Sequence, residues 1–354
     1  MGIFPTGCPT ARPNRAGPIV PPNCANVKQP LMSNAESVQE RLDPIALPDN
    51  IASVQPGGGF CYRLELIWGR WRRWYLKRFR SRYTQTMAEC RRGSTRGAPH
   101  EILDPRDLKY CRNLCSCYWE RSDDPFVWRE RIPLARWGLA ETLILGTPLL
   151  AMALLILVCW TWLWPLSGLL LLVFLWVLYF FRDPPRRIPP EDGLLVAPAD
   201  GKVAEVTRLD HDPFLGGPAV RIGVFLSIFN VHINRAPCAA QVIELRYAPG
   251  LFLNAINPQS AIKNENMWIG LQEENPPYRR FVVRQIAGLI ARRIVCAARP
   301  GETLSRGGQF GMIKLGSRTE LIVPDETGLS VTVKVGDRIK AGTTILAQYP
   351  SDLH

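Results

Sequence analysis

The sequence predicts an α+β protein that is mostly β, in which a transmembrane helical hairpin precedes a sandwich-like antiparallel β domain. Three observations support this prediction. An uncharged, apolar stretch covers residues 143–181. Short β-type runs separated by Gly, Pro, Asp and Asn follow it. Most of the positive charge lies before it. The chain therefore divides into a leader (1–60), a basic aromatic N-terminal extension (61–137), the hairpin (138–182) and the β domain (183–354).

The composition excludes several classes of protein. The 354 residues carry 43 Lys and Arg against 31 Asp and Glu, a net charge of +12. Residues 1–137 hold 22 of these basic residues and 13 of the acids, so the positive charge belongs to the N-terminal part. A hydrophobic content of 47% excludes a chain that is disordered throughout. Ten cysteines are too sparse for a small disulfide scaffold.

Residues 1–60 are rich in Pro, Asn, Gly and Ser, end in three glycines (57–59) and lack helix or strand periodicity, so we expect a flexible leader. No basic start followed by an apolar run and a cleavage site is present. We therefore expect no secretory signal and reduced cysteines. Cys111, Cys115 and Cys117 lack the paired spacing of structural zinc ligands, which predicts incidental thiols and no metal site.

Within the extension, residues 62–83 have helical periodicity. One face would carry Leu64, Trp68, Trp71, Tyr75, Phe79 and Tyr83. The other side would carry Arg70, Arg73, Lys77 and Arg80. Aromatic residues opposite Arg and Lys are typical of a helix in the headgroup region of an anionic membrane. Two other interpretations stay open: a nucleic-acid contact, and a helix packed on its own protein with a solvated basic side.

The uncharged stretch from Leu143 to Phe181 has 39 residues, close to twice the ~20 that one bilayer crossing needs. Pro165, Ser167 and Gly168 mark a turn in its middle. Arginines flank it on both sides: Arg129, Arg131 and Arg136 before, Arg182, Arg186 and Arg187 after. Positive flanks place both ends in the cytoplasm, which favours a hairpin of two helices. A single long tilted helix, or one spanning and one re-entrant segment, stays open.

From residue 183 the β-type runs predict a mostly antiparallel domain with few helices, and we expect the chemistry there. His232 follows the apolar run 224–228 and precedes Asn234 and Arg235. A strand that ends in such a polar cluster commonly directs a base toward a pocket. A single histidine is more often structural, however, so this candidate needs support from other residues.

Two further motifs add candidate groups. Asp200 lies in APADGKV, where Asp-Gly between β-type runs is ordinarily a hairpin turn. Gly316-Ser317 follows a glycine-rich turn and enters another strand. A glycine carbonyl is open to attack, and a base held by a carboxylate could activate the adjacent serine hydroxyl. The spacing alone does not show that Asp200, His232 and Ser317 meet.

From Phe180 onward the chain resembles the membrane-associated phosphatidylserine decarboxylase family in its short prokaryotic form. The matching motifs are FRDPP (181–185), APADGKV (197–203), FNVHINRAP (229–237), NEN (264–266), QIAGLIARRI (285–294) and GMIKLGSR (311–318). Their order and spacing cover about 175 residues, which makes the combination specific. Two departures are small: Leu315 stands where the family often has Phe, and Met267 follows NEN where the family often has Asn-Glu-Arg-Asn.

The resemblance implies a proenzyme that cleaves itself and then decarboxylates phosphatidylserine to phosphatidylethanolamine in phospholipid biosynthesis. It implies that Asp200 orients and polarises His232, and that His232 takes the proton from Ser317 Oγ, which attacks the Gly316 carbonyl. Cleavage would give a β chain of residues 1–316 and an α chain of residues 317–354. Ser317 would become a covalent pyruvoyl group, which is the expected cofactor.

The implied partner is phosphatidylserine in an anionic membrane, and the implied location is the cell (inner) membrane, with the β domain on the cytoplasmic side. No nucleic-acid partner is expected, and a homo-oligomer is left open. Two alternatives remain. Residues 333–342 resemble a turn of biotinyl and lipoyl carrier domains, which would suit a membrane-tethered barrel-sandwich carrier or adaptor, although no acceptor-lysine motif is present. The other alternative is an inactive homologue.

Overall fold

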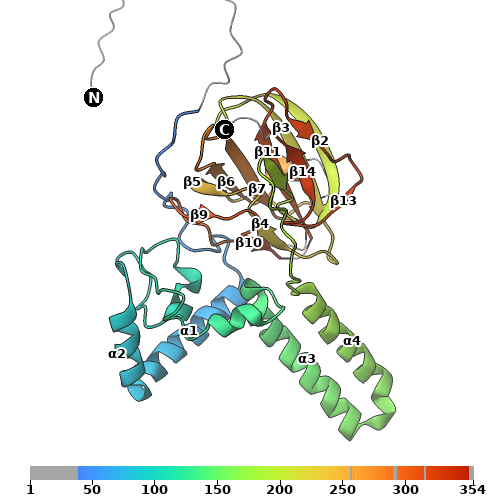
Figure 1. Cartoon of the computed structure of the whole chain (residues 1–354). Helices are drawn as coiled ribbons and strands as arrows, with labels where there is room; N and C mark the ends of the chain where they lie inside the picture. The colour runs from blue at the N-terminus through green and yellow to red at the C-terminus, as the bar shows by residue number, and fades with distance from the viewer. Residues whose placement is uncertain (1–38, 256, 258, 290–292, 315, 351–354) are drawn as a thin grey trace, which may run out of the picture. The chain divides into compact units, whose positions relative to one another are not determined.

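The computed structural model of the chain describes residues 39–255, 257, 259–289, 293–314 and 316–350 (Figure 1). Four predictions fall partly outside these residues. They are the leader over residues 1–38, the QIAGLIARRI motif over residues 290–292, the GMIKLGSR motif at residue 315, and the last four residues of the expected α chain.

The β domain is built from antiparallel strands, and its largest sheet has eight of them in the order β13-β2-β3-β11-β7-β6-β5-β9. This sheet is visibly curled (Figure 1). Its strands are β2 (Gly201–Asp212), β3 (Gly217–Leu226), β5 (Ala240–Ala248), β6 (Asn266–Gln272), β7 (Arg280–Ile286), β9 (Thr303–Leu304), β11 (Ser317–Pro324) and β13 (Arg338–Ile339).

Two three-stranded sheets complete the domain. One contains β1 (Leu194–Val196), β14 (Ile345–Gln348) and β12 (Ser330–Val331). The other contains β4 (Ile233–Arg235), β10 (Gln309–Ile313) and β8 (Ile294–Cys296). A single turn of helix, α5 (Ser260–Lys263), precedes β6. The predicted mostly β, α+β fold is confirmed.

Strand β11 is buried along its whole length, including two charged residues. Arg318 Nε donates to Glu320 Oε1 at 2.9 Å, and Arg284 Nη1 of β7 donates to Glu320 Oε2 at 2.8 Å. Arg318 also pairs with Glu205 of β2. Buried charges are tolerated when they are paired in this way. The network ties β11 to its neighbours and fixes the register of its first residue, Ser317, opposite Leu226 of β3.

The predicted leader differs from the structure over residues 39–59, because this segment packs on the β domain. Ile51 is 1% exposed within the main core, and Val54 is fully buried in a second apolar cluster. The Ile45 amide donates to the Ile243 carbonyl at 2.8 Å, and the Val54 carbonyl accepts from Cys296 at 2.9 Å. Isolated apolar residues in a polar segment contribute to a core without giving any periodicity, which explains why the sequence suggested flexibility.

Two helices, α3 (Leu139–Cys159) and α4 (Trp164–Phe180), form the predicted hairpin around a short 3₁₀ turn, Thr161–Leu163. They lie side by side (Figure 1), and Ser167 Oγ of α4 donates to the Ala153 carbonyl of α3 at 2.8 Å. The turn excludes a single long helix. Both helices are long and apolar enough to cross a membrane, and large apolar side chains such as Val158 and Leu172 are exposed.

The predicted helix at residues 62–83 is two helices, α1 (Phe60–Phe79) and α2 (Ser81–Cys90), which meet at Arg80. One interpretation of the sequence packed the aromatic side of α1 on the protein and left its basic side in solvent. The structure shows a different orientation. Arg72 and Arg73 point inward, where both pair with the buried carboxylate of Asp107. The tryptophans and Phe79 of α1 are exposed, whereas Tyr62 is half-buried against the second apolar cluster. Helical periodicity shows that two faces differ but cannot show which one is buried.

Asp107→Asn should release residues 61–137 from their packing, because it leaves the mostly buried Arg73 without a carboxylate and Arg72 with only Asp104, at 3.9 Å. Breaking a buried pair from one side costs roughly 3–5 kcal/mol. We expect a lower free energy of unfolding for this segment and faster limited proteolysis within it. The matched control is Glu101→Gln, which removes an ion pair to Lys77 whose side chains are both about half exposed. Such a pair contributes under about 1 kcal/mol. Equal protease resistance of the two variants would contradict the prediction.

Candidate functional site

His232 occupies a turn between β3 and β4 and is completely buried. Its Nδ1–H donates to the Asn230 carbonyl at 2.9 Å, and its Nε2 accepts the Gly316 N–H at 3.1 Å. These two bonds require the proton to be on Nδ1. Burial, opposed by the hydrogen bond to Asn230 and reinforced by the charge of Arg182, lowers the pKa of His232 to about 4. The imidazole is therefore neutral at physiological pH, with its Nε2 lone pair directed at the backbone next to Ser317.

The end of the hairpin covers this imidazole. The Phe180 ring at the end of α4 lies 4.6 Å from the His232 ring, centroid to centroid. Phe180 belongs to the second apolar cluster, together with Val54, Trp137, Phe181 and Met312. Such a cluster excludes water from one side of the histidine, which is the physical cause of its low pKa. Sequence reasoning missed this role of Phe180, although the motif FRDPP begins at the next residue.

Gly316 and Ser317 each have an unusual local structure. Gly316 has φ +63°, a left-handed conformation that glycine adopts without strain. Ser317 is fully buried, and its Oγ has no hydrogen-bond partner in the described part of the chain. An orphaned buried hydroxyl costs folding free energy and therefore calls for a functional explanation.

Gly288 makes room for the Gly316 carbonyl. A Cβ added at Gly288 would lie 2.2 Å from the Gly316 oxygen, well inside van der Waals contact. The neighbouring backbone is fixed by the predicted NEN motif: Asn264 Nδ2 donates to the Ala287 carbonyl at 2.7 Å, and the Glu265 carbonyl accepts from Ala287 at 2.9 Å. The motif therefore supports the segment that faces the Gly316 carbonyl.

A buried ion-pair network links the loop before Gly316 to the hairpin. Glu141, in the first turn of α3, pairs with Lys314 and also with Arg293 at 3.5 Å. All three side chains are largely buried. Arg293 packs against Gly59 of the leader, where a Cβ would lie 2.3 Å from its Nε. The sequence offered one signal for this network, a lone acid at the start of an otherwise apolar span.

Asp200 does not contact His232 in the structure, which differs from the expected role. Its Oδ2 accepts from Arg186 Nη2 at 2.9 Å, and its Oδ1 accepts from the Ala341 N–H at 2.8 Å. The Asn230 carbonyl takes the position at Nδ1 that the prediction gave to a carboxylate. Backbone carbonyls carry no sequence signal, so Asn230 could not have been identified from its residue type.

The three clustered cysteines pack in a small apolar core of the extension. Cys115 Sγ and Cys117 Sγ lie 3.5 Å apart, and burial raises the pKa of Cys117 to about 12. The Cys117 thiol is therefore protonated at neutral pH. The eight cysteines in the described part of the chain form no disulfide.

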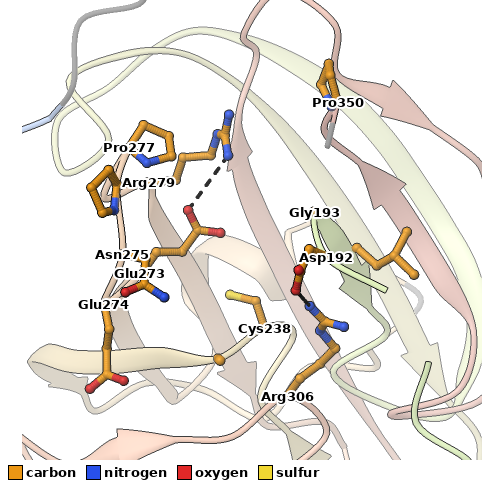
Figure 2. Close-up of a pocket in the computed structure, with 13 residues that line it drawn as sticks. Asp192, Gly193, Cys238, Glu273, Glu274, Asn275, Pro277, Arg279, Arg306 and Pro350 are labelled. Atoms are coloured by element: carbon orange, nitrogen blue, oxygen red, sulfur yellow. Dashed lines mark ion pairs between the residues drawn. The ribbon is translucent and has the colours of Figure 1, made fainter. Parts of the chain in front are cut away.

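A separate pocket lies elsewhere on the β domain (Figure 2). Its volume is about 190 Å³, and its charged lining includes Glu273 paired with Arg279, and Arg306 paired with Asp192. Burial raises the pKa of Glu273 to about 7. Neither His232 nor Ser317 lines this pocket, so it is distinct from the buried site at Gly316.

Comparison with known proteins identifies close relatives. The family model described as phosphatidylserine decarboxylase matches residues 173–347. A phosphatidylserine decarboxylase proenzyme of Rhodopirellula baltica is 47% identical over 242 residues, which cover 68% of this chain and 99% of the relative. Proenzymes of the same name from Desulfotalea psychrophila and Nitrosomonas eutropha are each 45% identical, over 52% and 53% of this chain and 84% of each relative.

Proposed function

Because the chain belongs to the phosphatidylserine decarboxylase family, we propose that it cleaves itself between Gly316 and Ser317 and then converts phosphatidylserine to phosphatidylethanolamine. One observation carries the residue assignment. A buried serine hydroxyl that has no hydrogen-bond partner among the described residues adjoins a glycine whose N–H is bonded to a neutral, buried imidazole. This arrangement combines a nucleophile, a base and an accessible carbonyl within two consecutive residues and one turn.

In the proposed cleavage, the Gly316 N–H first releases His232 Nε2, which then accepts the proton of Ser317 Oγ, and that oxygen attacks the Gly316 carbonyl carbon. The peptide C–N bond breaks as His232 passes this proton to the Ser317 nitrogen, and an ester joins Gly316 to the serine side chain. Loss of the Ser317 Cα proton then breaks the ester C–O bond, which leaves Gly316 with a carboxylate. Hydrolysis of the residue that remains at position 317 releases its nitrogen as ammonia. The Asn230 carbonyl keeps the imidazole oriented throughout.

The residues present fit a pyruvoyl group at position 317, because the orphaned Ser317 Oγ and the glycines at 316 and 288 leave the site open to self-cleavage. The pyruvoyl carbonyl supplies an electron sink for breaking the bond to the substrate carboxylate. Phe180 and its cluster exclude water from the histidine side. His232 holds or moves a proton at Nε2, and Asp200 supports the adjoining wall through Arg186 and the Ala341 amide.

We further propose that the hairpin crosses the cell membrane with both ends on the cytoplasmic side. Arginines flank both ends, and Arg182 lies two residues after the end of α4. Because the last residue of α4 is Phe180, which contacts His232, the span ends at the site itself. A diacyl lipid therefore needs to present only its headgroup, while its chains stay in the bilayer. This geometry supports an anionic membrane surface as the source of substrate.

Ser317→Ala should leave an intact chain of 354 residues with no decarboxylase activity, because it removes the attacking oxygen and the precursor of the pyruvoyl group. Denaturing electrophoresis and intact-mass analysis of the purified protein provide the measurement. The wild-type protein should give fragments 1–316 and 317–354, the second with a blocked N-terminus. Ser330→Ala, on exposed strand β12, is the matched control and should be processed normally. Cleavage of the Ser317→Ala chain would contradict the assignment.

The rate of self-cleavage should depend on pH through His232. Only the neutral imidazole has the Nε2 lone pair, and its pKa is about 4, below the ordinary 6.5. The rate should therefore stay constant from neutral pH down to about pH 5 and fall by half near pH 4. The measurement follows precursor loss at each pH, with circular dichroism as the control for folding. A half-maximal rate near pH 6.5 would contradict the prediction, because it would show that burial does not lower the pKa of the base.

Gly288→Ala should slow self-cleavage by about 100-fold, because the added methyl group displaces the Gly316 carbonyl from its reactive position. Gly217→Ala is the matched control, since a Cβ at Gly217 meets no atom within 4 Å. Both precursors should be compared by their rates of processing and by thermal unfolding. A Gly288→Ala precursor that is processed at the wild-type rate would show that this carbonyl contact does not position the bond.

A further inference from the structure

Helix α1 presents its apolar side outward and part of its charge inward. Cys61, Glu65 and Leu76 form its buried face, and the neighbouring Arg72 and Arg73 are committed to Asp107. The large apolar residues on its other side are exposed by half or more: Phe60, Ile67, Trp68, Trp71, Trp74 and Phe79. Soluble surfaces rarely expose so large a contiguous apolar patch unless another phase or molecule covers it.

The exposed aromatic rings form a continuous row along α1. Trp68 and Trp71 have ring centroids 5.0 Å apart, Trp71 and Tyr75 5.8 Å, and Tyr75 and Phe79 5.3 Å. Tryptophan and tyrosine are the side chains that favour the membrane–water interface, because each combines an apolar ring with a polar edge. The residue types in this row therefore suit the headgroup layer of a membrane.

Cations accompany this face. Among the described residues, five exposed arginines on α1 and around its end have no carboxylate partner: Arg63, Arg70, Arg78, Arg80 and Arg82. Lys77, by contrast, pairs with Glu101. Unpaired arginines beside exposed aromatic rings are complementary to the phosphates and acidic headgroups of an anionic lipid surface.

The apolar face of α1 is continuous with the start of the hairpin. Trp68 of α1 lines one cavity together with Leu139, Ala140 and Leu143 from the first turns of α3. A residue beside the first turns of a membrane-spanning helix lies at the depth of the interface. This continuity favours the bilayer as the partner of α1. Contact with the end of a membrane-spanning helix gives no reason to expect nucleic acid or a second copy of the chain there.

We propose that α1 is an interfacial membrane helix, which lies in the headgroup layer of the same anionic bilayer that the hairpin crosses, with its aromatic row toward the lipid. The proposal rests on the membrane insertion of the hairpin proposed above. It assigns to the N-terminal extension a contact with lipid that is independent of Ser317 and of the reaction.

The test uses the full chain reconstituted in phosphatidylcholine vesicles with or without phosphatidylglycerol, an anionic lipid that lacks the serine headgroup and so is not consumed. Tryptophan emission is compared between the wild type and the variant Trp68→Phe/Trp71→Phe/Trp74→Phe, which removes three fluorophores and keeps the face aromatic. The difference between the two spectra reports α1. Lipids brominated near the glycerol backbone or near the chain ends act as shallow and deep quenchers.

We expect the difference emission to be quenched, and more by shallow than by deep bromines, with stronger quenching when phosphatidylglycerol is present. Arg63→Glu/Arg70→Glu/Arg78→Glu should abolish the gain from phosphatidylglycerol. Trp268→Phe is the matched control, because Trp268 packs against Phe214 and Arg246 on the β domain, and its difference emission should stay unquenched.

The remaining emission separates this proposal from the membrane hairpin. Trp160, Trp162 and Trp164 at the hairpin turn persist in the triple variant, so their quenching reports insertion of the hairpin. Quenched hairpin emission with an unquenched α1 difference would overturn the interfacial helix alone and would favour a nucleic acid or protein partner. Unquenched emission from both would overturn the interfacial helix together with the membrane hairpin.

Discussion

The hydrogen bond from the Gly316 N–H to His232 Nε2 is the contact on which the rest of the site depends. It requires a neutral imidazole, and the neutral form requires the burial that Phe180 and its cluster provide. It also requires the backbone at Gly316 to approach the start of β4. The register of β11 against β3 and β7 provides that approach, and the paired charges of Arg318 and Glu320 hold the register.

The same constraint explains why membrane-type helices and a β domain share one chain so closely. Glu141 of α3 pairs with Lys314, two residues before the bond that we propose is cleaved, and α4 ends on the histidine. Each helix of the hairpin thus contacts one side of the site. A flexible tether would hold the domain near a bilayer, but it would supply neither the buried carboxylate nor the ring that excludes water. The hairpin is therefore part of the site as well as the membrane anchor that we propose.

The sequence predicted what local pattern and composition determine. Alternating short runs gave the antiparallel strands, and a long uncharged stretch with a central turn gave the two helices. The resemblance brought His232 together with Gly316, as the structure does. It did not place Asp200, because its oxygens are satisfied by Arg186 and by an amide 141 residues away. The inward direction of Arg72 and the packing of residues 39–59 depend on distant partners that no local pattern contains.

Burial of His232 affects both its protonation state and its strength as a base, and the proposed cleavage changes its surroundings. A pKa near 4 keeps Nε2 unprotonated at neutral pH. It also makes the imidazole a weak base, and proton transfer to a weak base is slow. A reaction that happens once per molecule tolerates a slow step; repeated decarboxylation does not. In the proposed sequence Gly316 becomes a chain end, so its N–H is no longer held at Nε2 by the covalent bond to β11. Self-cleavage would then create the electron sink. It would also free His232 Nε2 for proton transfer during decarboxylation of the lipid.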